Sequence, residues 1–130
     1  IASELASFPG MGRRFERVGM LNGAMLVDDY GHHPTEVSET LKAARAFHRA
    51  WQGEQAGKLV LAFQPHRFSR LHALWREFLE AFNDCDTLYL LDVYAAGEQA
   101  IEGVNAQALV QALNERGCPA HYAPSFEWLQ

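Results

Sequence analysis

The sequence predicts an α/β fold, a three-layer αβα sandwich with a mostly parallel sheet and a β-hairpin at its N-terminal end. Two continuous apolar runs, at 59–63 and 87–91, have the pattern of strands buried in a parallel sheet. They alternate with segments whose apolar residues recur every three or four positions, which is typical of amphipathic helices. This alternation indicates right-handed βαβ crossovers, with helices on both faces of the sheet. The pair Asn22-Gly23, between two strand-like segments, predicts the hairpin.

The composition indicates one soluble domain and argues against several classes of partner. A chain of 130 residues is long enough for a single hydrophobic core, and no apolar run approaches the roughly 20 residues of a membrane span. The formal net charge of -5 argues against a nucleic acid or an anionic membrane as the main partner. Cys85 and Cys118 lack the spacing of a metal site, so we expect two buried, reduced thiols, as in the cytoplasm, and no metal ligands.

The two ends of the chain differ from the rest. We expect residues 1–12 to be an interdomain linker, because the break Pro9-Gly10-Met11-Gly12 leaves no element long enough to stand alone. The domain itself is then expected at 13–130. Pro124-Ser125 has the pattern of a helix entry, but the chain ends at Gln130 after barely one turn, so we expect the domain to be truncated at its C-terminal end.

The first half of the domain is predicted to form the hairpin and one long helix. The hairpin strands are expected at 14–21 and 24–28, and Met25-Leu26-Val27 has the pattern of a buried strand. An amphipathic helix is expected from Pro34 to about residue 51. Pro34 suits the first helical position because its missing amide would be unpaired there, and Glu36 complements the positive end of the helix dipole.

The second half continues the alternation, and polar residues mark the ends of its helices. Ser69 is a candidate N-cap for the helix with the clearest apolar face, which extends as far as Phe82. Asn105 is a candidate N-cap for the last helix, and Gly117 is its candidate left-handed stop. Strands are expected at 59–63, 87–91 and 120–123, and helices at 69–82 and 106–116.

Three loops, at 28–33, 64–70 and 92–98, are expected to meet at one edge of the sheet, where the carboxyl ends of parallel strands converge and ligands bind. Arg67 and Arg70 stand there at the start of a helix, where the dipole disfavours a cation by a few tenths to about 1 kcal/mol. Either they bind an anion, such as a carboxylate or a phosphate, or they pair with acidic residues of the protein itself. On the residues alone, the two interpretations are equally open.

The loop at 28–33 has both structural and functional interpretations. Asp28 and Asp29 follow a predicted buried strand and repel each other unless a ribose diol, a cation or an arginine relieves the cost. Tyr30 either stacks on a purine or covers the edge of the core. For the histidines the structural interpretation is favoured, in which His32 hydrogen-bonds a carboxylate and His33 packs against or caps the helix.

The sequence lacks a phosphate-binding loop of the GxxxxGK[ST] type. The nearest segment, Gly53–Leu59, is one residue too short, and Leu59 replaces the hydroxyl that would hold magnesium. The segment also precedes a strand, whereas such a loop follows one. The chain therefore has no nucleoside triphosphatase site of its own.

Four segments resemble, in order and spacing, the carboxyl-terminal domain of the Mur ligases of peptidoglycan synthesis, and in particular the branch that joins L-alanine to UDP-N-acetylmuramate. The resemblance spans nearly the whole chain. The branch that recycles cell-wall tripeptide is an alternative, but it usually has Phe and Ala at the positions of Tyr30 and Gly31. Met11 stands where Thr is common. The four segments are Phe8 to Glu16, Val27 to Val37, Phe63 to Arg70 and Leu91 to Glu98.

The resemblance implies a Rossmann-like third domain of a longer, bacterial, cytoplasmic ligase. An amino-terminal domain would bind the UDP-sugar, and a central ATPase domain, ending in residues 1–12, would hold most of the ATP and Mg2+. The muramoyl carboxylate would become an acyl-phosphate that the amine of L-alanine attacks, and this chain alone would be inactive. A hypothesis of a different class is a stand-alone α/β module that binds a small anion or a nucleotide without chemistry.

The resemblance also implies roles for six residues, three at ATP and three at L-alanine. His32 would be the catalytic residue, either as a base or as a group that positions the alanine amine. Arg14 would approach the ATP phosphates, Asp29 would lie at the ATP ribose with Tyr30 near the base, and Arg67 and Arg70 would hold the carboxylate of L-alanine near His32.

Overall fold

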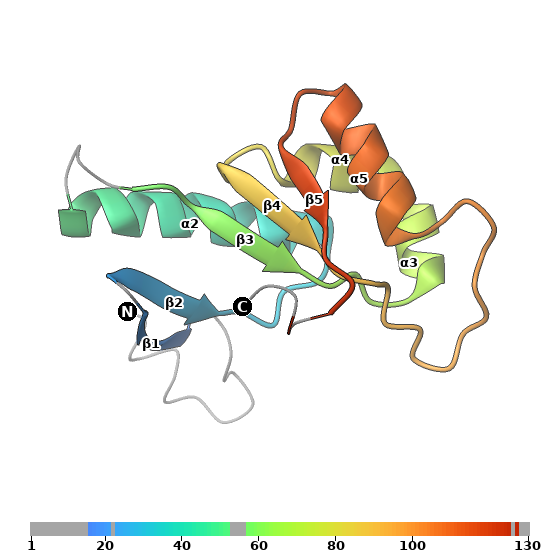
Figure 1. Cartoon of the computed structure of the whole chain (residues 1–130), viewed down its shortest axis with the longest axis horizontal. Helices are drawn as coiled ribbons and strands as arrows, with labels where there is room; N and C mark the ends of the chain where they lie inside the picture. Colours follow the sequence, from blue (N-terminus) through green and yellow to red (C-terminus); the bar gives the residue numbers. More distant parts are fainter. Residues whose placement is uncertain (1–15, 22, 53–56, 126, 128–130) are drawn as a thin grey trace.

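The computed structural model describes residues 16–21, 23–52, 57–125 and 127. The expected linker at 1–12, the domain start at residue 13, Arg14 and most of the helix expected after Ser125 lie outside these residues and stay predictions. In chain order the elements are β1 (Glu16–Leu21), β2 (Ala24–Asp28), α2 (Pro34–Gln52), β3 (Val60–Phe63), α3 (Phe68–Ala73), α4 (Trp75–Ala81), β4 (Thr87–Leu90), α5 (Ala106–Glu115) and β5 (Ala120–Tyr122) (Figure 1).

The predicted hairpin is confirmed, and it forms a two-stranded antiparallel sheet of its own from β1 and β2 (Figure 1). In the turn, Gly23 has a φ of 84°, in the left-handed region that glycine tolerates best. The prediction of a buried strand at Met25-Leu26-Val27 is wrong, since Leu26 is 43% and Val27 is 38% exposed. Within the described residues β2 pairs only with β1, and such a two-stranded ribbon leaves much of its surface in contact with solvent.

The parallel sheet has the strand order β3-β4-β5, which is the order of these strands in the sequence. Phe63 is in register with Leu90, and Leu88 is in register with Ala120. These four side chains share one face, because residues that pair across parallel strands, or lie two apart in one strand, point the same way. All four are buried, so this face of the sheet carries the core.

The opposite face of the sheet is largely open, so the prediction that β3 is covered on both faces is wrong. Val60 is 55% exposed, and Ala62 and His121 are also exposed. Right-handed crossovers between strands that lie in sequence order place every connecting helix on the same face. A second helical layer requires a strand order that reverses, and β3, β4 and β5 show no reversal.

The helices form one layer on the core face, in which α2 packs on α4, α4 on α5, and α5 on β4 and β5. Burying a large apolar side chain in such a core stabilises a fold by about 1.5–3 kcal/mol. The α/β class, the parallel sheet and the hairpin are therefore confirmed. No described helix is long and apolar enough to cross a membrane. The largest fully buried side chains include Leu71, Phe78, Phe82, Leu109 and Leu113.

The single helix expected from residue 69 to 82 is divided into α3 and α4 at Leu74. Leu74 has a φ of -111° and a ψ of 23°, outside the helical region, although its N–H still donates to the Arg70 carbonyl at 3.0 Å. Ser69 is not the N-cap, because the helix begins one residue before it. The N-cap position belongs to Arg67, whose side chain makes no capping hydrogen bond.

Both predicted ends of the last helix are confirmed. The side chain of Asn105 accepts a hydrogen bond from the Ala108 N–H at 2.8 Å, which satisfies an otherwise unpaired amide of the first turn. Gly117 has a φ of 83°, and its N–H donates to the Asn114 carbonyl at 3.0 Å. These contacts hold α5 in the position from which β5 enters the sheet.

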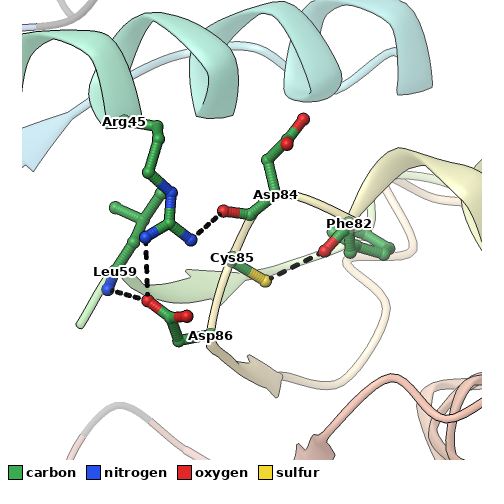
Figure 2. A network of polar contacts seen from close by, with 6 residues as sticks. All are labelled: Arg45, Leu59, Phe82, Asp84, Cys85 and Asp86. Atoms are coloured by element: carbon green, nitrogen blue, oxygen red, sulfur yellow. Dashed lines mark hydrogen bonds and ion pairs between the residues drawn. The ribbon is translucent and has the colours of Figure 1, made fainter.

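A charged contact joins three elements at the amino ends of β3 and β4 (Figure 2). Arg45 of α2 donates through Nη1 to Oδ2 of Asp86 at 3.1 Å and through Nη2 to the Asp84 carbonyl at 2.5 Å. The Leu59 N–H, just before β3, donates to the same Asp86 oxygen at 2.6 Å. The Leu59 amide and the Arg45 guanidinium hold the pKa of Asp86 below its usual value. We call these residues, Arg45, Leu59, Asp84 and Asp86, the carboxylate clamp.

The two cysteines form no disulfide with each other. Cys85, beside the carboxylate clamp, is buried, and its Sγ donates to the Phe82 carbonyl at 3.2 Å (Figure 2). Burial raises the pKa of the Cys85 thiol to about 12. Cys118 is half-buried, not fully buried as expected. A buried thiol with so high a pKa is a poor nucleophile, so Cys85 packs as a small apolar residue.

Replacing Asp86 with Ala is expected to lower the free energy of unfolding by about 1 kcal/mol, since two hydrogen bonds to a charged but partly exposed group are lost. Urea unfolding of the chain measures this. Glu39→Ala is the matched control, because Glu39 pairs with Lys42 within α2 and both side chains are mostly exposed. Equal losses in the two variants would contradict the role of the carboxylate clamp.

The carboxylate clamp is also expected to make stability depend on pH. The pKa of Asp86 is lower in the folded chain than in the unfolded chain, where it is about 3.9. Its contribution is therefore fully present above about pH 5 and is lost as the pH falls through the folded pKa. The difference in unfolding free energy between the unsubstituted chain and Asp86→Asn should shrink toward zero below about pH 4. A constant difference would show that the charge of Asp86 is not responsible.

Candidate functional site

The loops that follow β3 and β4, residues 64–70 and 92–98, run side by side, and we call them the paired loops. Hydrogen bonds connect them along their length, beginning where the two strands end. Because backbone groups make most of these bonds, the path of one loop determines the path of the other. The N–H groups of Leu91, Tyr94 and Arg67 donate to the carbonyls of Phe63, Pro65 and Tyr94 at 2.9, 2.8 and 2.7 Å, and the Gln64 side chain donates to the Asp92 carbonyl at 3.0 Å.

A row of four rings connects the loop at 28–33 to the paired loops. Tyr30 and His32 meet edge to face, with 5.5 Å between ring centroids. His32 stacks on His66 at 5.7 Å, and His66 lies 5.3 Å from the ring of Tyr94. The row takes one or two rings from each loop, so the expected convergence of the three loops is confirmed.

The contacts of His32 define its tautomer. Its ring Nδ1 lies 3.0 Å from the Tyr30 carbonyl oxygen, which can only accept a hydrogen bond, so Nδ1 carries the proton of the neutral ring. The other ring nitrogen, Nε2, is then the acceptor. The His32 ring thus bonds to a carbonyl and not to the carboxylate expected for it. A histidine held in this tautomer is suited to accept a proton through Nε2.

His33 caps α2, which is one of the two structural roles predicted for it. Its Nδ1 accepts a hydrogen bond from the Thr35 N–H at 3.1 Å, and the Glu36 carboxylate accepts one from the His33 N–H at 3.1 Å. This reciprocal pattern is a capping box in which an imidazole replaces the usual Ser or Thr hydroxyl. The same Glu36 oxygen lies 3.4 Å from the His32 N–H, so the cap also holds the backbone of His32.

Asp29 closes a tight turn at Gly31. Its Oδ1 accepts a hydrogen bond from the Gly31 N–H at 2.7 Å, in the manner of an Asx turn. A Cβ at Gly31 would lie 2.8 Å from that oxygen and 3.2 Å from the Cβ of Glu36. A ribose diol, a cation or an arginine was expected as a partner of the Asp28 and Asp29 carboxylates, and a partner found for Asp29 is the backbone N–H of Gly31. The Asp29 carboxylate has a structural role in this turn.

Arg67 and Arg70 lie at the beginning of α3, as predicted. Arg67 has a φ of 69°, in the left-handed region that is rare for residues other than glycine. Its side chain is exposed, and that of Arg70 is half-buried. None of the ion pairs found among the described residues includes either arginine. The structure thus does not support the alternative in which they pair with acidic residues of the protein, such as Glu77.

Glu98, at the end of the paired loops, binds Ser69 with both carboxylate oxygens. Oε1 accepts a hydrogen bond from the Ser69 N–H at 3.0 Å, and Oε2 accepts one from the Ser69 hydroxyl at 2.6 Å. The Ser69 contacts, and to a lesser degree the nearby charge of Arg67, lower the pKa of Glu98. Sequence reasoning included Glu98, His66 and Tyr94 in the convergent loops but assigned none of them to the site, because nothing in their spacing shows which residues meet.

A cavity of about 210 Å³ lies between β2, α2 and β3. Most of its lining is apolar, and its polar residues include Asp28, Asp29 and Thr40. Its lining includes neither Arg67 nor Arg70, and it includes neither His32 nor His66. The cavity is therefore separate from the two arginines and from the histidine stack. In the part of the chain that the structure describes, no group of three or more His, Cys, Asp or Glu side chains could hold a metal ion.

Comparison with known proteins shows that the chain is similar to ligases. The sequence profile described as Mur ligase, glutamate ligase domain, matches residues 13–129. The UDP-N-acetylmuramate–L-alanine ligase of Geobacter sp. (strain M21) is 50% identical over 117 residues, which are 90% of this chain and 24% of that protein. The ligase of the same name from Sinorhizobium fredii is 51% identical over 117 residues, with the same coverage.

Two solved structures share the fold. A UDP-N-acetylmuramate-alanine ligase from Thermotoga maritima has a TM-score of 0.61 and 21% identity, and the match covers 90% of this chain and 22% of that one. A murein peptide ligase from Psychrobacter arcticus has a TM-score of 0.61 and 17% identity, covering 98% of this chain and 25% of that one. This chain thus spans about a quarter of the length of the proteins that it matches.

Replacing Gly31 with Ala is expected to lower the free energy of unfolding by roughly 1–3 kcal/mol, since the added Cβ would displace the Asp29 carboxylate from the turn. Hydrogen exchange should also become faster at the His32 and His33 amides, which the Glu36 carboxylate holds next to that turn. Gly19→Ala is the control, because nothing lies within 4 Å of a Cβ placed there. Exchange rates that are the same in both variants would contradict the tight-turn assignment.

Proposed function

Because this chain belongs to the Mur ligase family, we propose that it is the carboxyl-terminal, amino-acid-binding domain of an ATP-dependent ligase that joins L-alanine to UDP-N-acetylmuramate. The observation that carries the proposal is the convergence of three loops beside two arginines that have no ion pair with a described residue. The similarity to UDP-N-acetylmuramate–L-alanine ligases supports the choice of substrates. The reaction belongs to peptidoglycan synthesis in the bacterial cytoplasm.

In this proposal Arg67 and Arg70 bind the carboxylate of L-alanine. A guanidinium presents two parallel N–H groups, which match the two oxygens of a carboxylate. L-Alanine is so small that fixing its carboxylate also restricts where its amine lies. The ring of His32 stacks on one side of His66, and the ring of Tyr94 is the other neighbour of His66. His32 is in the tautomer that leaves Nε2 able to accept a proton. Its proposed role, as a base or as a positioning group, is at the alanine amine.

The proposed reaction has two steps, and both balance without an oxidant or a reductant. The muramoyl carboxylate attacks the γ-phosphate of ATP, which releases ADP and leaves an acyl-phosphate. The amine of L-alanine then attacks the acyl carbon, an amide bond forms, and inorganic phosphate leaves. The amine loses one proton in this step, which is where the acceptor nitrogen of His32 would act.

ATP would reach this domain from the central domain of the full-length protein, which we propose holds most of the ATP and the Mg2+. The described residues offer a fitting contact at the nucleoside end. Tyr30 is 53% exposed and is proposed to stack on the base, and Asp29 beside it is held in a defined conformation by the Gly31 N–H. Arg14 is proposed to approach the phosphates.

Replacing Arg67 or Arg70 with Ala in the full-length protein is expected to raise the KM for L-alanine by about 10- to 100-fold, which corresponds to the loss of a charge-assisted hydrogen bond. The KM for ATP should change far less, because ATP is bound elsewhere. Steady-state kinetics with each substrate varied in turn measures both constants.

Arg76→Ala is the matched control for the two arginine variants. Arg76 is an exposed arginine of the neighbouring helix α4, so its loss removes the same charge at a place outside the loops. Both Michaelis constants should stay at their unsubstituted values in this variant. Equal increases for L-alanine and ATP in the Arg67 and Arg70 variants would mean that the arginines do not bind the amino acid.

A further inference from the structure

The contact between Glu98 and Ser69 is the last connection along the paired loops. It joins residues 29 positions apart in the sequence and uses both oxygens of the carboxylate. Two residues before Ser69, the Arg67 N–H donates to the Tyr94 carbonyl at 2.7 Å. The turn from Arg67 to Ser69 is therefore held at both ends by the loop that follows β4.

This turn contains the left-handed residue of the proposed amino-acid site. A non-glycine residue in that conformation costs on the order of 1–3 kcal/mol and persists only when its surroundings enforce it. The Tyr94 carbonyl holds this conformation at the start of the turn, through the Arg67 N–H, and Glu98 holds it at the end of the turn, through Ser69. Without the Glu98 contact, Arg67 and the first turn of α3, which includes Arg70, would be free to adopt other backbone conformations.

We propose that Glu98 is a positioning residue for the amino-acid carboxylate, because by holding Ser69 it fixes the turn from which Arg67 and Arg70 present their guanidinium groups. This role rests on the proposed function. Glu98 itself touches no substrate in it. Each of its two oxygens accepts a hydrogen bond from Ser69, and both bonds are short enough to hold that residue closely.

The opposite role, in which Glu98 competes with the substrate for the arginines, makes a contrary prediction. A competing carboxylate would pair with Arg67, and removing it would tighten the binding of L-alanine. The structure shows no ion pair between Glu98 and Arg67. The charge of Arg67 lowers the pKa of Glu98, but by less than the hydrogen bonds from Ser69 do. If Glu98 is instead a positioning residue, its removal must weaken the binding of L-alanine.

The test is steady-state kinetics of the full-length protein. Glu98→Ala should raise the KM for L-alanine about tenfold or more, with a smaller change in kcat and unchanged KM values for ATP and UDP-N-acetylmuramate. Glu98→Gln should restore most of the loss, because its amide can still accept from the Ser69 N–H and donate to the Ser69 hydroxyl oxygen. Ser69→Ala should cause a smaller increase, since it removes only the hydroxyl bond.

Glu102→Ala is the matched control, an exposed glutamate in the segment that connects β4 to α5, and its constants should stay unchanged. A KM for L-alanine that stays the same or falls in Glu98→Ala would overturn the positioning role, as would a Gln variant as impaired as the Ala variant. Hydrogen exchange gives an independent readout, because the Ser69 amide should exchange faster in Glu98→Ala and stay protected in Glu98→Gln.

Failure of this inference differs from failure of the proposed function. If the unsubstituted protein forms no product from L-alanine, the proposed function is overturned and the role of Glu98 falls with it. If that protein is active and the arginine variants raise the KM for L-alanine while Glu98→Ala does not, only the role of Glu98 is overturned.

Discussion

The order of the parallel strands constrains the rest of this structure. β3, β4 and β5 lie side by side in the order in which the chain forms them, so right-handed crossovers bring their helices to one face and their carboxyl ends to one edge. The same order makes the loops after β3 and β4 neighbours. Their backbone hydrogen bonds then follow directly from strand pairing and place Arg67 beside Tyr94. The loop between β2 and α2 adds His32, whose ring stacks on His66.

Elements with strong local signals were predictable from the sequence. Asn105 and Gly117 define the ends of α5 through contacts within a few residues, and the hairpin follows from Asn22-Gly23. The buried face of each strand was harder to predict. An apolar run such as 59–63 is compatible with cover on one face or on two, and only the strand order shows that Val60 and Ala62 lie on the open side.

The candidate site was predictable as a set of loops, but its internal contacts were not. The order of strands and helices is enough to bring Arg67 and His32 to one edge. Two such contacts are the hydrogen bonds between Glu98 and Ser69 and the stacking of His66 on His32. They depend on how loops 29 or more residues apart in the sequence pack together, and no periodic pattern in the sequence indicates this. The helix break at Leu74 escaped prediction for a related reason, since its apolar spacing continues unchanged across the break.

The carboxylate clamp lies at the other end of the strands from the paired loops. A strand of four residues separates them, about 13 Å at 3.3 Å per residue, and they share no hydrogen-bonding partner in the contacts described. Substitutions at sites this far apart usually have additive effects on free energy. The paired loops, which carry the proposed amino-acid site, can therefore change in sequence while the carboxylate clamp at the amino-terminal ends of the strands keeps the fold stable.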